Sequence, residues 1–219
     1  MKRIKLLTLF CAVFLTSAAY GNFNVSGQTS FMHFFGETKL THFGGGAKLE
    51  YVYNDYGAAY GGMNYYAKSD YTGIVEAEGI ADVSRLVDIP VPNSSVSFVQ
   101  VMVGARVYFY GEVDPPIKGD FGFYGIGEFS LLAGTSEGNI NKDGYELYNV
   151  PIYGKQKGTF WNYTGSLGVG GEKQIGRPFI YAEAKFNAKI DEANPFVIET
   201  RIPFGMSYFI GIRLPLSSY

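Results

Sequence analysis

The chain has 219 residues, a formal net charge of −2, and 17% charged and 17% aromatic residues. Ordinary soluble domains carry roughly 25% charged residues, so this chain is poor in charge and rich in Tyr, Phe and Gly. The near-zero net charge gives no indication of a nucleic-acid partner. After residue 21 no apolar run approaches the ~20 residues of a membrane-spanning helix.

The N-terminal 21 residues follow the order of a secretory signal peptide. A basic head precedes an apolar run over residues 6–14 and small residues over 16–19. The alternative is a membrane anchor, but the run is too short to cross a bilayer. We therefore predict a cleaved signal over 1–21 and one domain over 22–219. The only cysteine, Cys11, lies in the signal, so the mature chain has no disulfide.

Eight segments alternate apolar and polar residues with period two, as strands do. Most exceed the ~9–11 residues with which a tilted strand crosses a bilayer. The predicted strands cover 22–36, 43–54, 56–69, 96–111, 119–134, 158–171, 177–190 and 203–217. An exported chain without membrane helices satisfies its backbone in lipid by closing a barrel. The prediction is an all-β fold, a transmembrane antiparallel up-and-down β-barrel of about eight strands.

The connections between these strands differ in length. Short turns lie at 54–57, 112–118 and 172–176, and two long connections span 70–95 and 135–157. Outer-membrane barrels have short periplasmic turns and longer extracellular loops. We therefore expect both chain ends in the periplasm and both long connections outside the cell. The short connection 37–42 is the exception to this pattern.

The residue composition of the two strand faces indicates which face meets lipid. In the predicted strands from 96 onward, the apolar face carries no charge, as with Val101 and Val103. The other face is mostly Ser, Asn, Gln, Gly and Tyr, whereas the outer face of a soluble lipocalin-type barrel should be dense in Lys and Glu. A membrane barrel is therefore favoured over a soluble one.

These features resemble the small OmpA/OmpX-like outer-membrane barrel proteins. The resemblance rests on the signal, the eight amphipathic strands, the unequal loops, and a last strand from Phe204 to Leu216 followed by Tyr219. It covers the whole mature chain and is one of architecture. It implies a barrel in the bacterial outer membrane and transfers no activity.

Seven charged residues fall on the face assigned to the lumen, in one layer of the lower half of the barrel. Lys189 lies nearer the outer rim. Arg106 and Glu128 sit on neighbouring strands, as do Glu183 and Arg213. The layer comprises Lys48, Glu50, Arg106, Glu128, Glu183, Lys185 and Arg213. Since the two signs nearly cancel, a salt-bridged plug is favoured over an ion or proton pathway, which should show an excess of one sign.

No motif indicates catalysis, a cofactor or a metal site. The two histidines, His33 and His42, lie near the first outer loop, and Ser30 precedes His33 by an odd offset. In a strand that offset places them on opposite faces. The glycine run 44–46 precedes no helix, so it predicts a strained strand start or close strand approach and not a phosphate loop. We expect no enzyme.

The outer loops are the remaining candidates for function. Both are expected to be hairpins that extend past the membrane, and Tyr145, Tyr148 and Tyr153 are candidate contact residues. The expected role is structural, surface-contact or envelope-complex. The alternatives are a small pore or transporter and a lipid-modifying enzyme. The expected partners are outer-membrane lipid, the barrel-assembly machinery, and an envelope protein or a host surface.

Overall fold

The computed structural model describes residues 22–35, 40–79, 86–113, 121–140, 148–149, 153–193 and 204–216. Within these ranges no helix is long and apolar enough to cross a membrane. The strands are β1 (Asn22–Phe35), β2 (Leu40–Asn54), β3 (Gly57–Gly79), β4 (Leu86–Tyr110), β5 (Phe121–Ile140), β6 (Tyr148–Asn149), β7 (Gly154–Gln174), β8 (Phe179–Ala193) and β9 (Phe204–Pro215). The predicted signal lies outside the described residues and stays a prediction.

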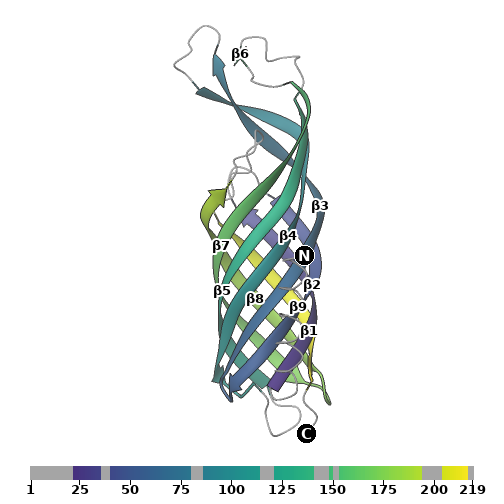
Figure 1. Ribbon diagram of the computed structural model, residues 1–219, viewed down its shortest axis with the longest axis vertical. Coiled ribbons are helices and arrows are strands. Elements are labelled where there is room, and N and C mark those ends of the chain that lie inside the picture. Colours follow the sequence, from purple (N-terminus) through teal and green to yellow (C-terminus); the bar gives the residue numbers. More distant parts are fainter. Residues whose placement is uncertain are drawn as a thin grey trace, which may run out of the picture.

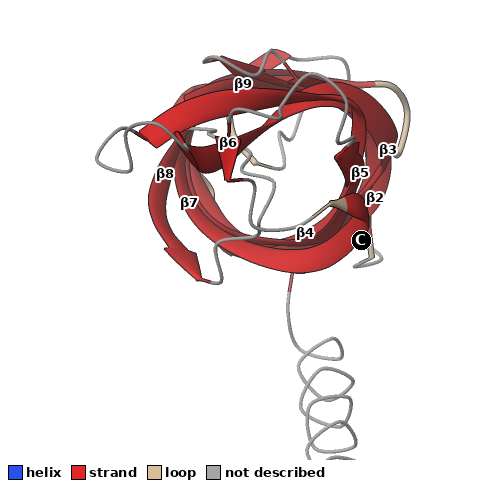
Figure 2. Cartoon of the chain, turned by 90° about the horizontal axis from the view of Figure 1, so that it is seen from above, coloured by secondary structure: helices blue, strands red, loops and turns tan. Residues whose placement is uncertain are grey.

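The long strands form one closed antiparallel barrel. Their order is β2-β1-β9-β8-β7-β5-β4-β3, and the β2–β3 pairing closes the ring (Figures 1 and 2). β1 meets β9 along most of its length, from Asn24↔Pro215 to Phe35↔Phe204. The eight predicted strands correspond to β1–β5 and β7–β9, so the up-and-down barrel is confirmed.

Local sequence explains the tight turns and the close strand contacts. In the turn between β2 and β3, the Asn54 side chain accepts a hydrogen bond from the Tyr56 amide at 3.0 Å, a typical Asx turn. Between β7 and β8, Gly176 has a φ of 70°, which suits glycine. In β2, a Cβ on Gly46 would collide with the carbonyl oxygen of Met63. The glycine run therefore allows close strand approach, as predicted.

The strands β3 and β4 are much longer than a membrane requires, with 23 and 25 residues. Among the described residues, β3 pairs with β2 only as far as Tyr66, and β4 pairs with β5 only from Ser95 downward. Beyond these points β3 and β4 continue as a hairpin, which rises above the ring in Figure 1. The expectation that the long connections extend as hairpins is confirmed for 70–79 with 86–95.

The predicted ends of these strands, at residues 69 and 96, are therefore wrong. Pro90 and Pro92 disfavour a strand in the sequence pattern because proline lacks an amide donor. Both lie in the outer part of β4, which among the described residues pairs with β3 alone. Prolines are tolerated at such a sheet edge.

Candidate functional site: the lumen and the projecting sheet

Four charged side chains inside the barrel form a neutral cluster, the lysine quartet of Lys48, Glu128, Glu183 and Lys185. The Lys185 Nζ lies 2.6 Å from Glu128 Oε2 and 3.3 Å from Glu183 Oε2. The Lys48 Nζ lies 2.7 Å from the same Glu183 oxygen. The Tyr60 hydroxyl donates to Glu128 at 2.8 Å. Buried charges are tolerated when they are paired and hydrogen-bonded in this way.

A second neutral cluster, the arginine quartet, comprises Glu50, Arg106, Glu172 and Arg213. Arg106 lies 2.5 Å from Glu50 Oε1 through Nη2 and 3.2 Å from Glu172 Oε2 through Nη1. Arg213 pairs with the same two carboxylates, at 3.6 Å from Glu50 and in direct contact with Glu172. Both guanidinium groups therefore bridge two acids, and all four side chains are buried.

Glu172 is the member of this cluster that the sequence analysis missed. The prediction ended its strand at residue 171 and assigned Glu172 to a turn, but β7 runs to Gln174. Glu172 is only 4% exposed. Glu172 lies an even number of residues after Thr164 and Ser166, which both face the lumen. The alternation of β7 therefore already indicated that Glu172 faces the lumen too. With Glu172 included, each quartet holds two cations and two carboxylates.

Amide and hydroxyl side chains fill the lumen on the outer side of the lysine quartet. Gln28 donates to Asn64 at 2.7 Å, and Asn64 donates to Gln100 at 3.1 Å. Gln100 donates to Ser130 at 3.1 Å, and Ser130 bonds to Thr164 at 2.7 Å. This chain of hydrogen bonds crosses the barrel from β1 to β7, so the polar groups of the layer satisfy one another.

An aromatic cap of Phe34, His42, Tyr66 and Phe98 lies beyond the amide layer. The ring centroids of His42 and Phe98 are 4.7 Å apart, and those of Tyr66 and Phe98 are 4.6 Å apart. The His42 ring bonds through Nδ1 to the carbonyl oxygen of Ala67 at 3.2 Å. All four rings are buried, so they close the outer end of the lumen.

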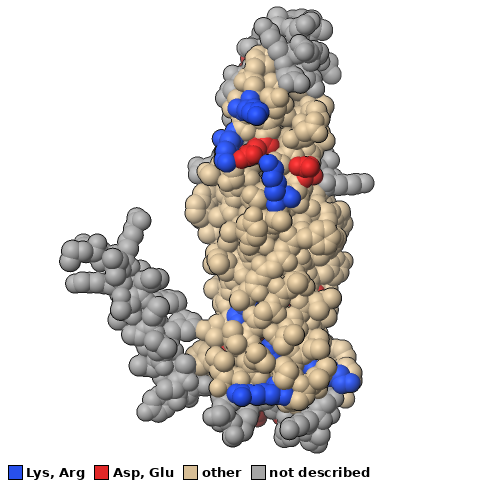
Figure 3. Space-filling view, turned by 90° about the vertical axis from the view of Figure 1, so that its right-hand side faces the viewer, with Lys and Arg blue, Asp and Glu red and all other residues tan. Residues whose placement is uncertain are grey.

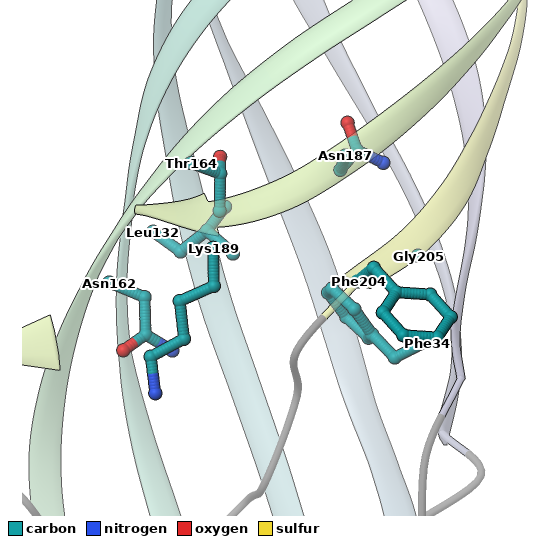
Figure 4. A pocket seen from close by; sticks show the side chains of 8 residues that line it. All are labelled: Phe34, Leu132, Asn162, Thr164, Asn187, Lys189, Phe204 and Gly205. Carbon is teal, nitrogen blue, oxygen red and sulfur yellow. The ribbon is translucent and has the colours of Figure 1, made fainter. Parts of the chain in front are cut away.

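A small cavity remains beside the aromatic cap (Figure 4). Its volume of about 10 Å³ holds roughly one water molecule. The cavity is lined by Phe34, Leu132, Asn162, Thr164, Asn187, Lys189, Phe204 and Gly205. Lys189 is half-buried there. The space is far too small for a solute.

The segment after β4 covers the opposite end of the lumen. Val113 is fully buried, and its amide donates to the Asp55 carbonyl at 2.8 Å. Its own carbonyl accepts a hydrogen bond from Arg213 at 2.9 Å. The arginine quartet therefore has a backbone cover on the side of the short turns.

The two histidines do not share a site. His33 pairs in register with Thr41, and its Nδ1 lies 2.8 Å from the Thr41 hydroxyl. His42 pairs with Met32 and is buried in the lumen, whereas His33 is half-exposed. Neighbouring strand positions point to opposite faces, so the barrel wall separates the rings. Ser30 is on the lumen side, 5% exposed.

The outer ends of four strands form what we term the projecting sheet: β3 over 67–79, β4 over 86–95, β5 over 135–140 and β7 over 154–160. Its inner face is apolar and continuous with the aromatic cap. The buried residues of this face include Tyr71, Val75, Ala77, Ile89, Val91, Ile140 and Phe160. The sheet therefore has a packed core of its own beyond the barrel.

Two of the three predicted contact tyrosines, Tyr148 and Tyr153, fall at the far end of this sheet. Tyr145 lies outside the described residues. Tyr148 belongs to β6, whose backbone pairs with Glu78 and Gly79 of β3. Tyr153 directly precedes β7, and its side chain is 39% exposed. The structure thus brings Tyr148 to the end of β3, while the role of the three residues stays a prediction.

The outer face of the barrel is apolar where the lumen is polar. Leu167 is 74% exposed and Ile210 is 63% exposed. In Figure 3 charged side chains gather toward the two ends, and a broad uncharged zone separates them. Exposed apolar side chains around a polar interior are expected only when the outer face meets lipid. The chain is a membrane-spanning barrel of the outer-membrane type.

The chain can also be compared with known proteins. No protein-family model and no curated protein matches the sequence. The solved structure of Ail, the attachment invasion locus protein of Yersinia pestis, is 8% identical, with coverage of 89% of this chain and 97% of Ail and a TM-score of 0.47. Neisserial surface protein A is 10% identical, with coverages of 88% and 96% and a TM-score of 0.48.

A major outer membrane protein from Thermus thermophilus is also similar. It is 10% identical, with coverages of 88% and 98% and a TM-score of 0.47. At these identities and TM-scores the solved structures carry no argument about function, which has to be argued from the residues of this chain.

Proposed function

We propose that this chain is a non-catalytic outer-membrane barrel protein that contacts molecules outside the cell through its projecting sheet. The observation that carries the proposal is the packed core of that sheet, where Tyr71, Val75 and Ile89 are buried beyond the barrel. A loop that only connects two strands needs no such core. A rigid platform for contacts does.

The strand edges of the projecting sheet support a contact role. Among the described residues, β3 has no β2 partner beyond Tyr66, and β7 has no β8 partner before Trp161. Such edges present backbone donors and acceptors that an extended segment of a partner can pair with. The partner would be a host-surface molecule or another envelope protein.

The filled lumen favours a contact role for this protein and argues against a pore. Both quartets are neutral, and side chains fill the space between Val113 and the aromatic cap. An eight-stranded barrel is just wide enough for its own side chains. A selective pore would show an open path and an excess of one sign.

Labelling of single cysteines in intact cells tests the orientation. The mature chain is predicted to contain no cysteine, so Thr72→Cys on the projecting sheet and Asp55→Cys in a short turn report on opposite ends. A membrane-impermeant maleimide should label Thr72→Cys in intact cells and Asp55→Cys only after the outer membrane is opened. The reverse pattern would place the projecting sheet in the periplasm and refute the proposal.

Shortening of the β3–β4 hairpin tests the contact role. Asp70 pairs with Ser95, so an Asn-Gly turn between these two residues should close the hairpin without disturbing the barrel. Cells with the shortened protein should lose adhesion to immobilised host-cell surface and crosslinks to envelope proteins. Heat-modifiable gel migration confirms that the barrel still folds. Unchanged adhesion and unchanged crosslinks would contradict the proposed role.

A further inference from the structure

Three lysines and one glutamate lie close together on the outer face of the projecting sheet, and two of the lysines pair with the glutamate. The Glu137 carboxylate of β5 lies 2.7 Å from the Lys157 Nζ of β7 and 3.3 Å from the Lys68 Nζ of β3. Lys155 lies two residues from Lys157 on the same face of β7. These four residues line a hollow of about 360 Å³, which we term the lysine hollow.

The lysine hollow carries an excess of positive charge. Hydrogen bonds from Lys157 and Lys68 hold the pKa of the exposed Glu137 carboxyl below its usual range, so this carboxylate is ionised near neutral pH. The lining of the hollow thus includes one carboxylate and three ammonium groups. Within the described residues Lys155 has no ion pair, and Lys68 and Lys157 remain 60% and 69% exposed. The hollow can therefore accept an anion.

The height of the hollow above the membrane indicates which anion it meets. Trp161 is 43% exposed on the same face of β7, four residues below Lys157. A strand that rises ~3.3 Å per residue at a tilt of ~45° separates the two residues by about 9 Å along the membrane normal. Tryptophan is enriched at the membrane interface. The lysines thus stand at the level of the hydrated lipid headgroups, just beyond the apolar zone of the outer face, and face sideways toward those headgroups.

We propose that the lysine hollow binds the phosphate groups of a phosphorylated glycolipid headgroup in the outer leaflet. Ammonium groups bind phosphate as point charges, and three of them converge here from two strands. Asn93 and Gln156 also line the hollow and can hydrogen-bond sugar hydroxyl groups. The inference rests on the proposed outward orientation of the projecting sheet. It gives the barrel a specific lipid partner.

Binding of lipid A, the diphosphorylated glycolipid, to the purified barrel in detergent tests this proposal. Native mass spectrometry measures the bound fraction for the wild type and for the triple variant Lys68→Gln, Lys155→Gln, Lys157→Gln. Each lysine removed should weaken binding by about fivefold, the contribution expected of one basic side chain near an anionic membrane surface. Lys173→Gln is the matched control, since Lys173 is exposed at the opposite end of β7 and its loss should change nothing.

Dephosphorylated lipid A and soluble anions test whether the bound anion is the phosphate of a glycolipid or a free anion. Lipid A without its phosphates should bind the wild type as weakly as lipid A binds the triple variant. Equal binding of both lipid forms, or equal binding by wild type and triple variant, would overturn the proposal. Inorganic phosphate and soluble heparin are also tested for their ability to displace bound lipid A. If either one binds to the hollow more strongly than lipid A does, the proposal is overturned in favour of a site for free anions.

Failure of this inference can be told apart from failure of the proposed function. If Thr72→Cys is labelled in intact cells but the triple variant binds lipid A like the wild type, only the lysine hollow is refuted. If the triple variant loses binding in detergent but Thr72→Cys is not labelled, the lysines do bind the phosphates, but the outward orientation is wrong and the ligand in the cell cannot be an outer-leaflet glycolipid.

Discussion

The strand β7 reverses its polarity where it leaves the barrel. Within the barrel Leu167 is exposed on the outer face, and Ser166 is buried in the lumen. Beyond the barrel Lys157 is exposed on the outer face, and Phe160 is buried on the inner one. The same strand therefore has an apolar outside in one region and a charged outside in the other. The medium around it changes from lipid to water between these residues.

The strand β5 shows the same reversal. Phe129 faces outward and Glu128 inward inside the barrel, whereas Glu137 faces outward and Ile140 inward on the projecting sheet. In water, burial of apolar side chains stabilises a core. In lipid the outer face is already apolar, so the interior of the barrel is organised by ion pairs and hydrogen bonds. The two regions are thus stabilised by different interactions.

The largest expected effect comes from breaking the lysine quartet. In Lys185→Met, Glu128 would keep its charge in a site where its side chain is 0% exposed. Loss of one partner of a buried ion pair costs about 3–5 kcal/mol. Urea unfolding of the barrel in lipid vesicles measures this free energy.

A second substitution and an exposed control sharpen this test. The double variant Lys185→Met, Glu128→Gln should recover part of the loss, because no uncompensated charge remains. Lys173→Met, at an exposed site, should change the free energy of unfolding very little. A loss below about 1 kcal/mol for Lys185→Met, the range of exposed ion pairs, would show that the lumen is hydrated.

An arginine placed at two positions of β7 compares the two media directly. Leu167→Arg puts a charge on the lipid-facing surface, where Arg costs about 2–4 kcal/mol near the midplane of the bilayer. Thr159→Arg puts the same charge on the exposed outer face of the projecting sheet and should change the stability by less than about 0.5 kcal/mol. Equal effects in vesicle unfolding experiments would show that both surfaces meet the same medium.

The smallest expected effect concerns the core of the projecting sheet. Ile89→Val removes one buried methylene group and should cost about 0.5–1.5 kcal/mol, because Ile89 is 2% exposed. Hydrogen exchange should become faster over the outer parts of β3 and β4 while the barrel keeps its protection. Ile212→Val, at a lipid-facing position that is 51% exposed, should leave exchange in the projecting sheet unchanged. Similar exchange in both variants would mean that the sheet has no cooperative core.

Period-two alternation predicted the eight strands and seven of the eight charged residues of the two quartets. It also assigned Lys48 and Glu50 to the lumen although the early strands alternate less cleanly. The partners could not be predicted from neighbouring strands, because most of the ion pairs join strands that are not adjacent in the barrel. Arg106 of β4, for example, pairs with Glu50 of β2 and Glu172 of β7.

The projecting sheet was harder to predict for a physical reason. Its inner residues, such as Tyr71 and Val75, alternate with Thr72 as in any half-buried strand. Acidic residues and two prolines interrupt the alternation over 70–95, and proline disfavours a strand. The lysine hollow depends on the pairing of β3, β4, β5 and β7, and Lys68 is 69 residues away from Glu137 in the sequence. No local pattern could bring them together.

Maleimide labelling of two cysteine variants in lipid vesicles tests the reversal of polarity most directly. Lys157→Cys and Leu167→Cys lie on the same outward face of β7, and both positions are well exposed on the protein surface. If β7 passes from lipid into water, a water-soluble maleimide should label Lys157→Cys quickly and Leu167→Cys only after the protein is denatured. Equal labelling of the two variants in intact vesicles would show that the apolar face meets water and would contradict the membrane-spanning barrel.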